Sequence, residues 1–220
     1  MNKKYSIIKL GNNKGAVIPI FGEMTIETNK ALEETVDNIS KDKELKFIIL
    51  EINSLGGDAE GVHEVAYKIR ALNKPVMAYV LQDALSGAYW VTAAADSIHL
   101  KNELCAVGSV GVYSTYVDSS AQLINSGLNI EIIKKGKLKA ETTGFTSLTE
   151  AGKKLLQEKV DLIYEVFYKF VKHCRGGLND GDLQGQPHYG KKAIQRNFAD
   201  SICSPIELQI KLFKILSDGV

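Results

Sequence analysis

Cysteine is scarce in this sequence. Three cysteines stand among 220 residues, and they are far apart, at Cys105, Cys174 and Cys203. None belongs to a C-x-x-C pair, and their number is odd, so neither a disulfide framework nor a zinc site is indicated. We therefore expect three reduced thiols and no bound metal.

An excess of charge of either sign is also absent. Lysine and arginine number 27 and the acidic residues 26, which gives a formal net charge of +1. Such a balance provides no general attraction to nucleic acid or to anionic lipid. The one basic run, at 134–139, is flanked by Glu131 and Glu141. We therefore expect no nucleic-acid partner.

Long apolar segments are missing as well. Polar residues interrupt the stretch from Met1 to Lys14, which does not fit the apolar region of a secretory signal peptide. No other segment is long enough to span a bilayer. For the chain as given, the expectation is a protein without a membrane anchor that works in the cytoplasm.

Strand-like and helix-like patterns alternate along the chain. Apolar runs typical of strands cover 16–21, 47–52, 76–80 and 97–100, while helical spacing covers 32–39 and 60–72. This order predicts an α/β fold with a mostly parallel sheet and right-handed crossovers. We expect one domain over residues 1–220, with a core at 15–147 and a helical part at 148–220.

The second half of the chain gives weaker patterns. A run at 129–133 resembles a strand, and residues 177–190 have the composition of a polar surface loop. From Thr149, apolar residues at steps of four and three predict a long helix that ends near residues 175–177. A terminal helix is expected at 205–216.

A serine begins one of the expected helices. Ser86 and Gly87 follow the run at 76–80 and open the sequence Ser-Gly-Ala-Tyr-Trp. The first N–H groups of a helix lack intrahelical partners and favour negative charge, which the tetrahedral intermediate of acyl transfer develops. Ser86 is therefore either a nucleophile or an ordinary helix N-cap.

Two glycines follow the strand-like run at 47–52. Gly56 and Gly57 have no Cβ, so a substrate can approach their backbone and their N–H groups can point at a carbonyl oxygen. Sites in parallel sheets open at the carboxyl ends of strands, where this turn and Ser86 can converge. A phosphate loop is not indicated, because neither G-x-x-x-x-G-K-[ST] nor G-x-G-x-x-G occurs.

Serine hydrolysis also needs a base. The four histidines, His63, His99, His173 and His188, fall in contexts that suggest no catalytic triad. A lysine replaces histidine when it is partly desolvated and held neutral, well below its reference pKa of about 10.4. Composition alone does not choose among the lysines of the basic run, which are Lys134, Lys135, Lys137 and Lys139.

Taken in order, these stretches resemble the signal peptide peptidase A family of serine/lysine peptidases. The resemblance covers roughly residues 15–202 and rests on the segments Asn53–Gly57, Lys74–Val76, Ser86–Trp90, Ala94–Asp96, Gly108–Val112 and Gly136–Lys139. Two residues depart from the family pattern, Leu55 in place of a frequent proline and Ala88 in place of a frequent glycine. Leu55 leaves the turn less fixed, because proline would have set φ.

The resemblance assigns roles to particular residues. It implies that Ser86 is the nucleophile, that Lys139 is the general base, and that Ser109 helps to hold that lysine. It also implies an oxyanion hole built from backbone N–H groups of Gly56, Gly57 and Gly87. No metal and no cofactor is expected.

The resemblance also implies an architecture and a function. The architecture is a Clp-protease/crotonase-like sheet of repeated β-β-α/βαβ units, with flanking helices and a C-terminal helical extension. Family members assemble into closed homo-oligomeric rings and act on polypeptides. Short anchorless members resemble bacteriophage head-maturation proteases, so we expect an endopeptidase that cleaves phage scaffold or capsid proteins in a phage-infected or prophage-carrying cell.

Alternatives stay open at this point. The same enzyme type degrades small peptides such as signal-peptide remnants. A crotonase-like acyl-CoA enzyme would share the fold and the glycine turn without needing both Ser86 and Lys139. A catalytically silent, ring-forming scaffold would keep the apolar stripes and lose the dyad.

Overall fold

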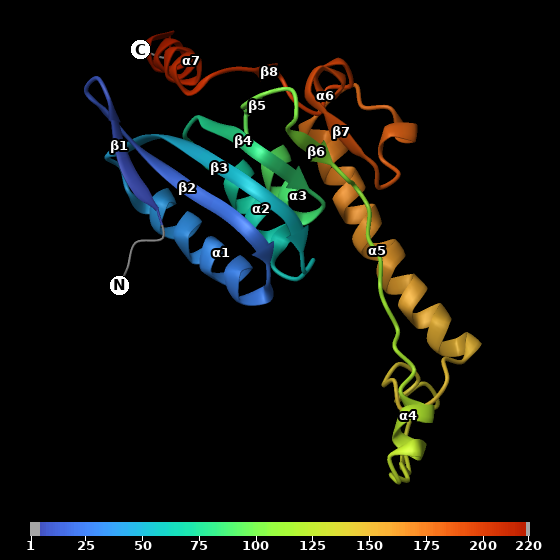
Figure 1. The fold of residues 1–220 in the computed structure, drawn as a ribbon. Helices are drawn as coiled ribbons and strands as arrows, with labels where there is room; N and C mark the ends of the chain where they lie inside the picture. Colours follow the sequence, from blue (N-terminus) through green and yellow to red (C-terminus); the bar gives the residue numbers. More distant parts are fainter. Residues whose placement is uncertain (1–4, 219–220) are drawn as a thin grey trace. The chain divides into compact units, whose positions relative to one another are not determined.

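The computed structural model describes residues 5–218, which divide into two compact units (Figure 1). One unit runs up to Gly111 and resumes at Phe167, and the other is Val112–Val166. Each unit is described by itself. The single domain with its internal boundary at 147/148 stays a prediction.

The first unit is built on one eight-stranded sheet. Its parallel strands are β2 (Asn13–Met24), β3 (Leu45–Gly57), β4 (Val76–Leu85), β5 (Ser97–Leu100) and β8 (Ser201–Ile202). β1 (Ser6–Leu10) pairs antiparallel with β2 at one edge. β6 (Ala106–Gly108) lies parallel to the last residues of β4 and pairs antiparallel with β7 (Pro187–Tyr189). The predicted α/β fold with a mostly parallel sheet is confirmed.

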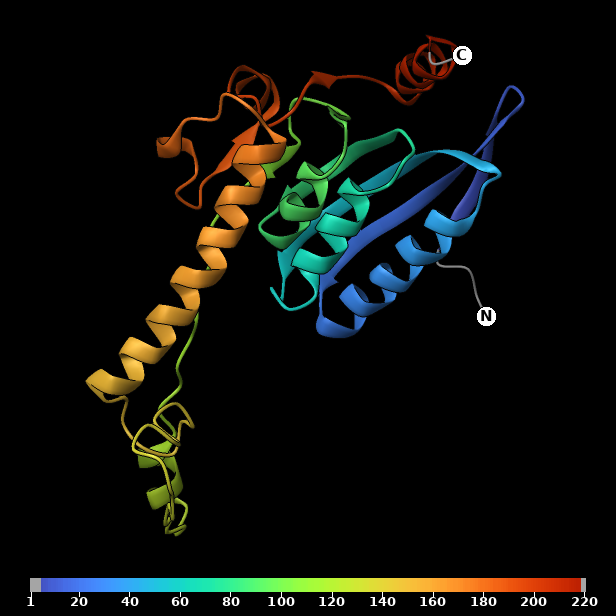
Figure 2. The same ribbon diagram turned by 180° about the vertical axis from the view of Figure 1, so that it is seen from behind.

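Three helices cover one face of this sheet. Figure 2 shows α1 (Ile26–Lys41), α2 (Val62–Arg70) and α3 (Gly87–Ala93) side by side over it. Thr25 is the N-cap of α1, and its Oγ1 accepts a hydrogen bond from Thr28 N at 3.3 Å. The buried residues of α2, which are Val62, Val65, Ala66 and Ile69, keep the helical spacing seen in the sequence.

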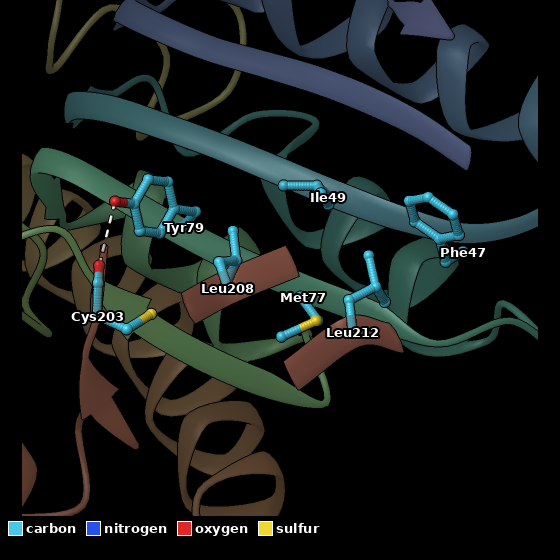
Figure 3. Packing of buried hydrophobic residues seen from close by; sticks show 7 residues of the cluster. All are labelled: Phe47, Ile49, Met77, Tyr79, Cys203, Leu208 and Leu212. Carbon is cyan, nitrogen blue, oxygen red and sulfur yellow. Dashed lines mark hydrogen bonds between the residues drawn. The ribbon is translucent and has the colours of Figure 1, made fainter. Parts of the chain in front are cut away.

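The opposite face of the sheet is covered by α7 (Pro205–Asp218). Leu208 and Leu212 of this helix belong to one buried cluster with alternate residues of β3 and β4, as Figure 3 shows; these are Phe47, Ile49, Met77 and Tyr79. The residues between them, such as Ile48, are buried on the helical face. Burial on both faces explains why the runs at 47–52 and 76–80 are continuously apolar.

The end of α5 (Glu150–Cys174) belongs to the same unit from Phe167 onward. Phe167 stacks on Trp90 with ring centroids 4.5 Å apart and planes 8° apart. Arg175 then forms two hydrogen bonds with Asp200, at 2.8 and 3.1 Å. The predicted long helix is confirmed, and its buried end ties the C-terminal part of the chain to the sheet.

The segment at 177–190 is more ordered than its polar composition predicted. It contains the 3-10 helix η1 (Asp180–Asp182) and strand β7, and α6 (Gly190–Gln195) follows directly. Elements of three residues are too short to leave a hydrophobic period in the sequence, so the composition of turn residues dominated the prediction.

The second unit contains little regular structure. It holds α4 (Ser120–Asn125) and the part of α5 that precedes Phe167. The strand expected at 129–133 is wrong, since these residues form no regular element. Ile130 and Ile133 are both exposed, and no strand of this unit pairs with the run. Alternating apolar residues do not form a strand without a neighbour to complete its hydrogen bonds.

Candidate active site

Ser86 lies in a strained turn between β4 and α3. Its backbone has φ 53° and ψ −124°, a region that residues other than glycine seldom adopt. The Ser86 N–H donates to Gly108 O at 2.9 Å, and its carbonyl accepts from Trp90 N at 3.0 Å. The partly exposed side chain makes no capping hydrogen bond, although the residue occupies the N-cap position. Its conformation resembles the sharp strand-to-helix turns that present a nucleophilic serine.

The glycine turn at the end of β3 packs directly against Ser86. A Cβ placed on Gly56 would lie 2.9 Å from Ser86 Cβ and 2.8 Å from Leu85 O. A Cβ on Gly57 would lie 2.4 Å from Met24 O, on the other side of the turn. Both glycines have positive φ, 94° and 153°. Only glycine fits these two positions, and the fit brings the turn into contact with the serine.

Two backbone N–H groups are placed near each other beside Ser86. Gly87 is the first residue of α3, so its N–H has no acceptor within the helix. Its N lies 2.9 Å from where a Cβ on Gly56 would be, and Gly57 N lies 3.9 Å from where a Cβ on Gly87 would be. Asp58 N–H donates to Met24 O at 2.7 Å, and because successive N–H groups of a strand point to opposite sides, that of Gly57 points away from β2.

The N–H of Gly56 already has a partner. It donates to Ser54 Oγ at 3.1 Å. Ser54 is buried, and its own hydroxyl donates to Gly22 O at 2.6 Å. Gly56 therefore contributes to the site by having no side chain. The N–H groups of Gly57 and Gly87 are better placed than its own to donate to an oxyanion.

Ser109 follows the neighbouring strand β6 at the same end of the sheet. Leu85 and Gly108 are register partners, so Ser86 and Ser109 are the next residues of two paired strands. Ser109 has φ 52°, and its N–H donates to Gln186 O at 3.0 Å, just before β7. The first unit thus brings Ser86, Ser109 and the glycine turn together, at the carboxyl ends of β3, β4 and β6.

Lys139 belongs to the second unit and Ser86 to the first, and each is described within its own unit. Its side chain is exposed, and its N–H donates to Gly136 O at 3.1 Å. Lys134, in the same basic run, binds Glu141 at 2.7 Å. This hydrogen bond, followed by one from Thr149, lowers the pKa of Glu141. The ion pair therefore engages the Lys134 ammonium group with a carboxylate of its own unit.

Some residues around the site were not predicted from the sequence. Ser54 lies inside the Asn53–Gly57 segment, but its spacing did not predict that its hydroxyl binds both Gly22 O and Gly56 N. Asn29 lies within α1, and its Nδ2 donates to Asp58 O at 3.1 Å and to Glu60 O at 2.7 Å. A buried polar residue near the start of a helix, like this one, carries no local sequence signal.

Between residues 5 and 218, no three side chains of His, Cys, Asp or Glu gather as a metal site would require. In the same part of the chain, no helix is both long enough and apolar enough to cross a membrane.

Solved structures with a related fold include several enzymes. A membrane-bound stomatin-specific protease, 1510-N, aligns with a TM-score of 0.59 at 15% identity and covers 89% of this chain and 82% of its own. ClpP1 from Listeria monocytogenes aligns with a TM-score of 0.59 at 10% identity, over 88% and 94%. An enoyl-CoA hydratase from Shewanella pealeana gives 0.58 at 13% identity, over 97% and 73%. At these identities the likeness shows the fold alone, and it confirms the Clp-protease/crotonase-like architecture.

Relatives in sequence are mostly proteases. A putative protease MJ0651 of Methanocaldococcus jannaschii is 34% identical over 142 residues, which is 64% of this chain and 45% of the relative. A putative signal peptide peptidase SppA of Enterococcus faecium is 29% identical, over 91% and 60%. The head-tail preconnector protein GP5 of Enterobacteria phage P21 is 26% identical, over 73% and 33%. The chain therefore spans about a third to three fifths of the length of these relatives.

A family-wide comparison agrees with these relatives and with the geometry around Ser86. The family described as Peptidase family S49 matches residues 68–212, a range that contains Ser86, Ser109 and Lys139. This match extends over more than half of the sequence, and the chain therefore belongs to peptidase family S49.

Proposed function

We propose that this protein is a serine endopeptidase that hydrolyses peptide bonds with Ser86 as nucleophile and Lys139 as general base. One observation carries the proposal most strongly. Ser86 is held in a strained strand-to-helix turn, against a glycine turn whose lack of side chains leaves backbone N–H groups beside the serine. Strain of this kind persists where the surrounding structure imposes it, and it is concentrated at functional sites.

The proposed reaction has two stages. Neutral Lys139 accepts the proton of Ser86 Oγ as this oxygen attacks the substrate carbonyl carbon, and the N–H groups of Gly57 and Gly87 bind the resulting oxyanion. The Lys139 ammonium then gives the proton to the leaving amine, which leaves an acyl group on Ser86. In the second stage, water attacks the acyl carbonyl with the same groups in the same roles. Ser109 orients Lys139 through its hydroxyl.

The proposed substrates are polypeptides. The relative named head-tail preconnector protein comes from a phage, which supports the processing of phage scaffold or capsid proteins in the bacterial cytoplasm. The relative named signal peptide peptidase supports the degradation of small peptides instead. Cleavage assays that compare recombinant scaffold and capsid proteins with synthetic signal peptides distinguish the two.

Covalent labelling tests the nucleophile. A fluorophosphonate probe is expected to react at Ser86, and Ser86→Ala is expected to abolish both labelling and hydrolysis of casein, because only binding and oxyanion contributions then remain. Ser40→Ala, at an exposed serine of α1, is the matched control and keeps both. Retention of more than about a tenth of the hydrolysis rate in Ser86→Ala rejects the assignment. Tight binding of an acyl-CoA by the wild type, without labelling, favours the crotonase-like alternative.

Single substitutions in the basic run test the base. We expect Lys139→Ala to lower hydrolysis nearly as far as Ser86→Ala, and the same change at Lys134, Lys135 or Lys137 to have a mild effect. Because only the neutral amine accepts a proton, activity rises with pH and falls in acid. If another lysine of the run is indispensable while Lys139 is not, the assignment of the base is wrong.

A further inference from the structure

We infer that Ser54 and Asn29 are positioning residues, which hold the turn at Gly56–Asp58 so that the Gly57 N–H lies beside Ser86. The inference rests on the proposed function and deepens it. Neither side chain touches the reacting atoms in the proposed reaction. Both are almost fully buried, with 2% and 1% of their surface exposed, and both bind the backbone of the turn or of its neighbours.

Ser54 joins β2 to β3 where the regular pairing of strands is interrupted. The register of β2 on β3 shifts between Phe21 and Glu23, and that of β3 on β4 shifts between Ile52 and Ser54. At this interruption the Ser54 hydroxyl donates to Gly22 O at 2.6 Å and accepts from Gly56 N at 3.1 Å. The Ser54 side chain thus connects β2 and β3 where the regular pairing of the strands is interrupted. It also fixes Gly56, the first residue of the turn.

Asn29 holds the other end of the turn. Its Nδ2 donates to Asp58 O at 3.1 Å and to Glu60 O at 2.7 Å, which ties α1 to the chain that leaves Gly57. Two carbonyl acceptors identify this branch of the amide as the NH2 group. The other branch, Oδ1, is buried and has no hydrogen-bond partner among the described residues.

Small displacements of this turn act directly on the serine. The glycine turn and the Ser86 turn leave no room for a Cβ between them, as the 2.8–2.9 Å approaches at Gly56 show. A shift of the turn therefore changes the position of the Gly57 N–H relative to Ser86 and Gly87. A misplacement of about 1 Å at a reacting centre costs about 100-fold in rate.

The experiment compares Ser54→Ala, Asn29→Ala and a matched control, Thr35→Val, in the full chain. Thr35 is a buried residue of α1, and its hydroxyl donates to Ala31 O at 2.8 Å, within the same helix. We expect the two test variants to react with a fluorophosphonate probe at Ser86 about 100-fold more slowly than the wild type, with the KM for casein unchanged. Thr35→Val reacts at the wild-type rate, and Ser54→Thr, which restores the hydroxyl, recovers to within about tenfold.

Amide hydrogen exchange provides a readout that does not depend on peptidase activity. The Gly56 N–H is expected to exchange at least about tenfold faster in Ser54→Ala, since it loses its acceptor, and no faster in Thr35→Val. Wild-type labelling rates and unchanged Gly56 exchange in both folded test variants overturn the inference. If Ser54→Ala does not fold, labelling and exchange in Asn29→Ala decide it. If the wild type shows no labelling at Ser86 while the exchange results hold, the proposed function fails and the positioning of the turn stands.

Discussion

At the level of single residues, the site combines two strained serines with two glycines that no other residue can replace. A non-glycine residue in a sparsely populated backbone region costs of order 1–3 kcal/mol. Ser86 bears this cost at φ 53° and Ser109 at φ 52°, and both stand at strand ends that meet in the sheet. Strain at two paired strand ends is the expected result when function, rather than stability, selects the residue.

The crowding at Gly56 leads to a specific prediction. Gly56→Ala places a methyl group 2.8 Å from Leu85 O and 2.9 Å from Gly87 N, which are backbone atoms of the serine turn. Because backbone atoms cannot rotate away, the serine turn must shift, and labelling of Ser86 by a fluorophosphonate probe is expected to fall at least about 100-fold. The φ of 94° adds roughly 1–2 kcal/mol of destabilisation for a residue with a Cβ.

Gly176→Ala is the matched control for this prediction. A Cβ at Gly176 meets no atom within 4 Å, and the residue is absent from the glycines with positive φ. We expect Gly176→Ala to keep the labelling rate and to leave thermal stability unchanged or slightly raised. Equal labelling rates in Gly56→Ala and the wild type contradict the close contact between the two turns.

At the level of elements, β5 carries a histidine beside β8, and we expect its environment to make folding sensitive to acid. His99 is 5% exposed, and its Nδ1 and Nε2 lie 2.9 and 3.0 Å from the hydroxyls of Ser201 and Ser97. Burial, followed by the positive charge of Lys211, lowers the pKa of His99 from its ordinary value near 6.5 to about 4. Asp200 acts in the opposite direction, and Arg175 in the same direction as Lys211.

The direction of this pH effect follows from the number of protons that the folded and the unfolded chain bind at His99. Between pH 6.5 and about 4 the unfolded chain binds a proton at His99 that the folded chain does not, so acid favours unfolding. The free energy of unfolding is expected to fall by up to about 3 kcal/mol as the pH drops through this window. Urea unfolding of the wild type and His99→Gln at several pH values measures it. The variant loses this part of the pH dependence, and parallel pH profiles for the two proteins contradict the prediction.

Elements also show what the sequence could and could not predict. β3 and β4 were predicted because burial on both faces makes them continuous apolar runs, and α5 because a long stripe is periodic over several turns. β7 was missed because three residues leave no period, and 129–133 was misread because pairing depends on a neighbour that local sequence does not reveal. Ser86 and the Gly56–Gly57 turn were found through their residue types.

The rest of the candidate site depends on contacts between distant positions. Ser54 binds Gly22, and Asn29 binds Asp58 and Glu60; the partners are about thirty residues apart in the sequence in each case. No spacing rule connects such partners before the fold is known. The choice of Lys139 over its neighbours came from family resemblance.

At the level of the whole molecule, the unit that carries Lys139 has almost no core of its own. Among the described residues, every buried hydrophobic residue lies outside Val112–Val166, and so do the buried polar and charged residues. Large apolar side chains of this unit are exposed instead; they are Tyr113, Val117, Ile124, Leu128, Ile130, Ile133, Leu138, Phe145 and Leu162. A segment that buries so little apolar surface cannot offset the entropy of ordering its backbone.

We propose that a second copy of the chain packs against these exposed side chains. Many exposed apolar side chains in one unit indicate an interaction surface, and homo-oligomers are the usual assemblies. In such an assembly, contacts between subunits order the segment at 134–141, so Lys139 reaches its working position only in the oligomer.

A dilution series with light scattering and parallel casein hydrolysis tests this. We expect specific activity to fall together with the oligomer as the protein is diluted, because dissociation exposes the Val112–Val166 unit and releases Lys139.

Ile133→Glu places a charge on a side chain that is 92% exposed in the single chain, and it is expected to yield an inactive monomer. Leu104→Glu, at an 81% exposed leucine of the first unit, is the matched control and keeps both the oligomer and the activity. A monomer with full activity at any concentration, in either the wild type or Ile133→Glu, refutes the proposal, since Lys139 would then be ordered without a neighbour.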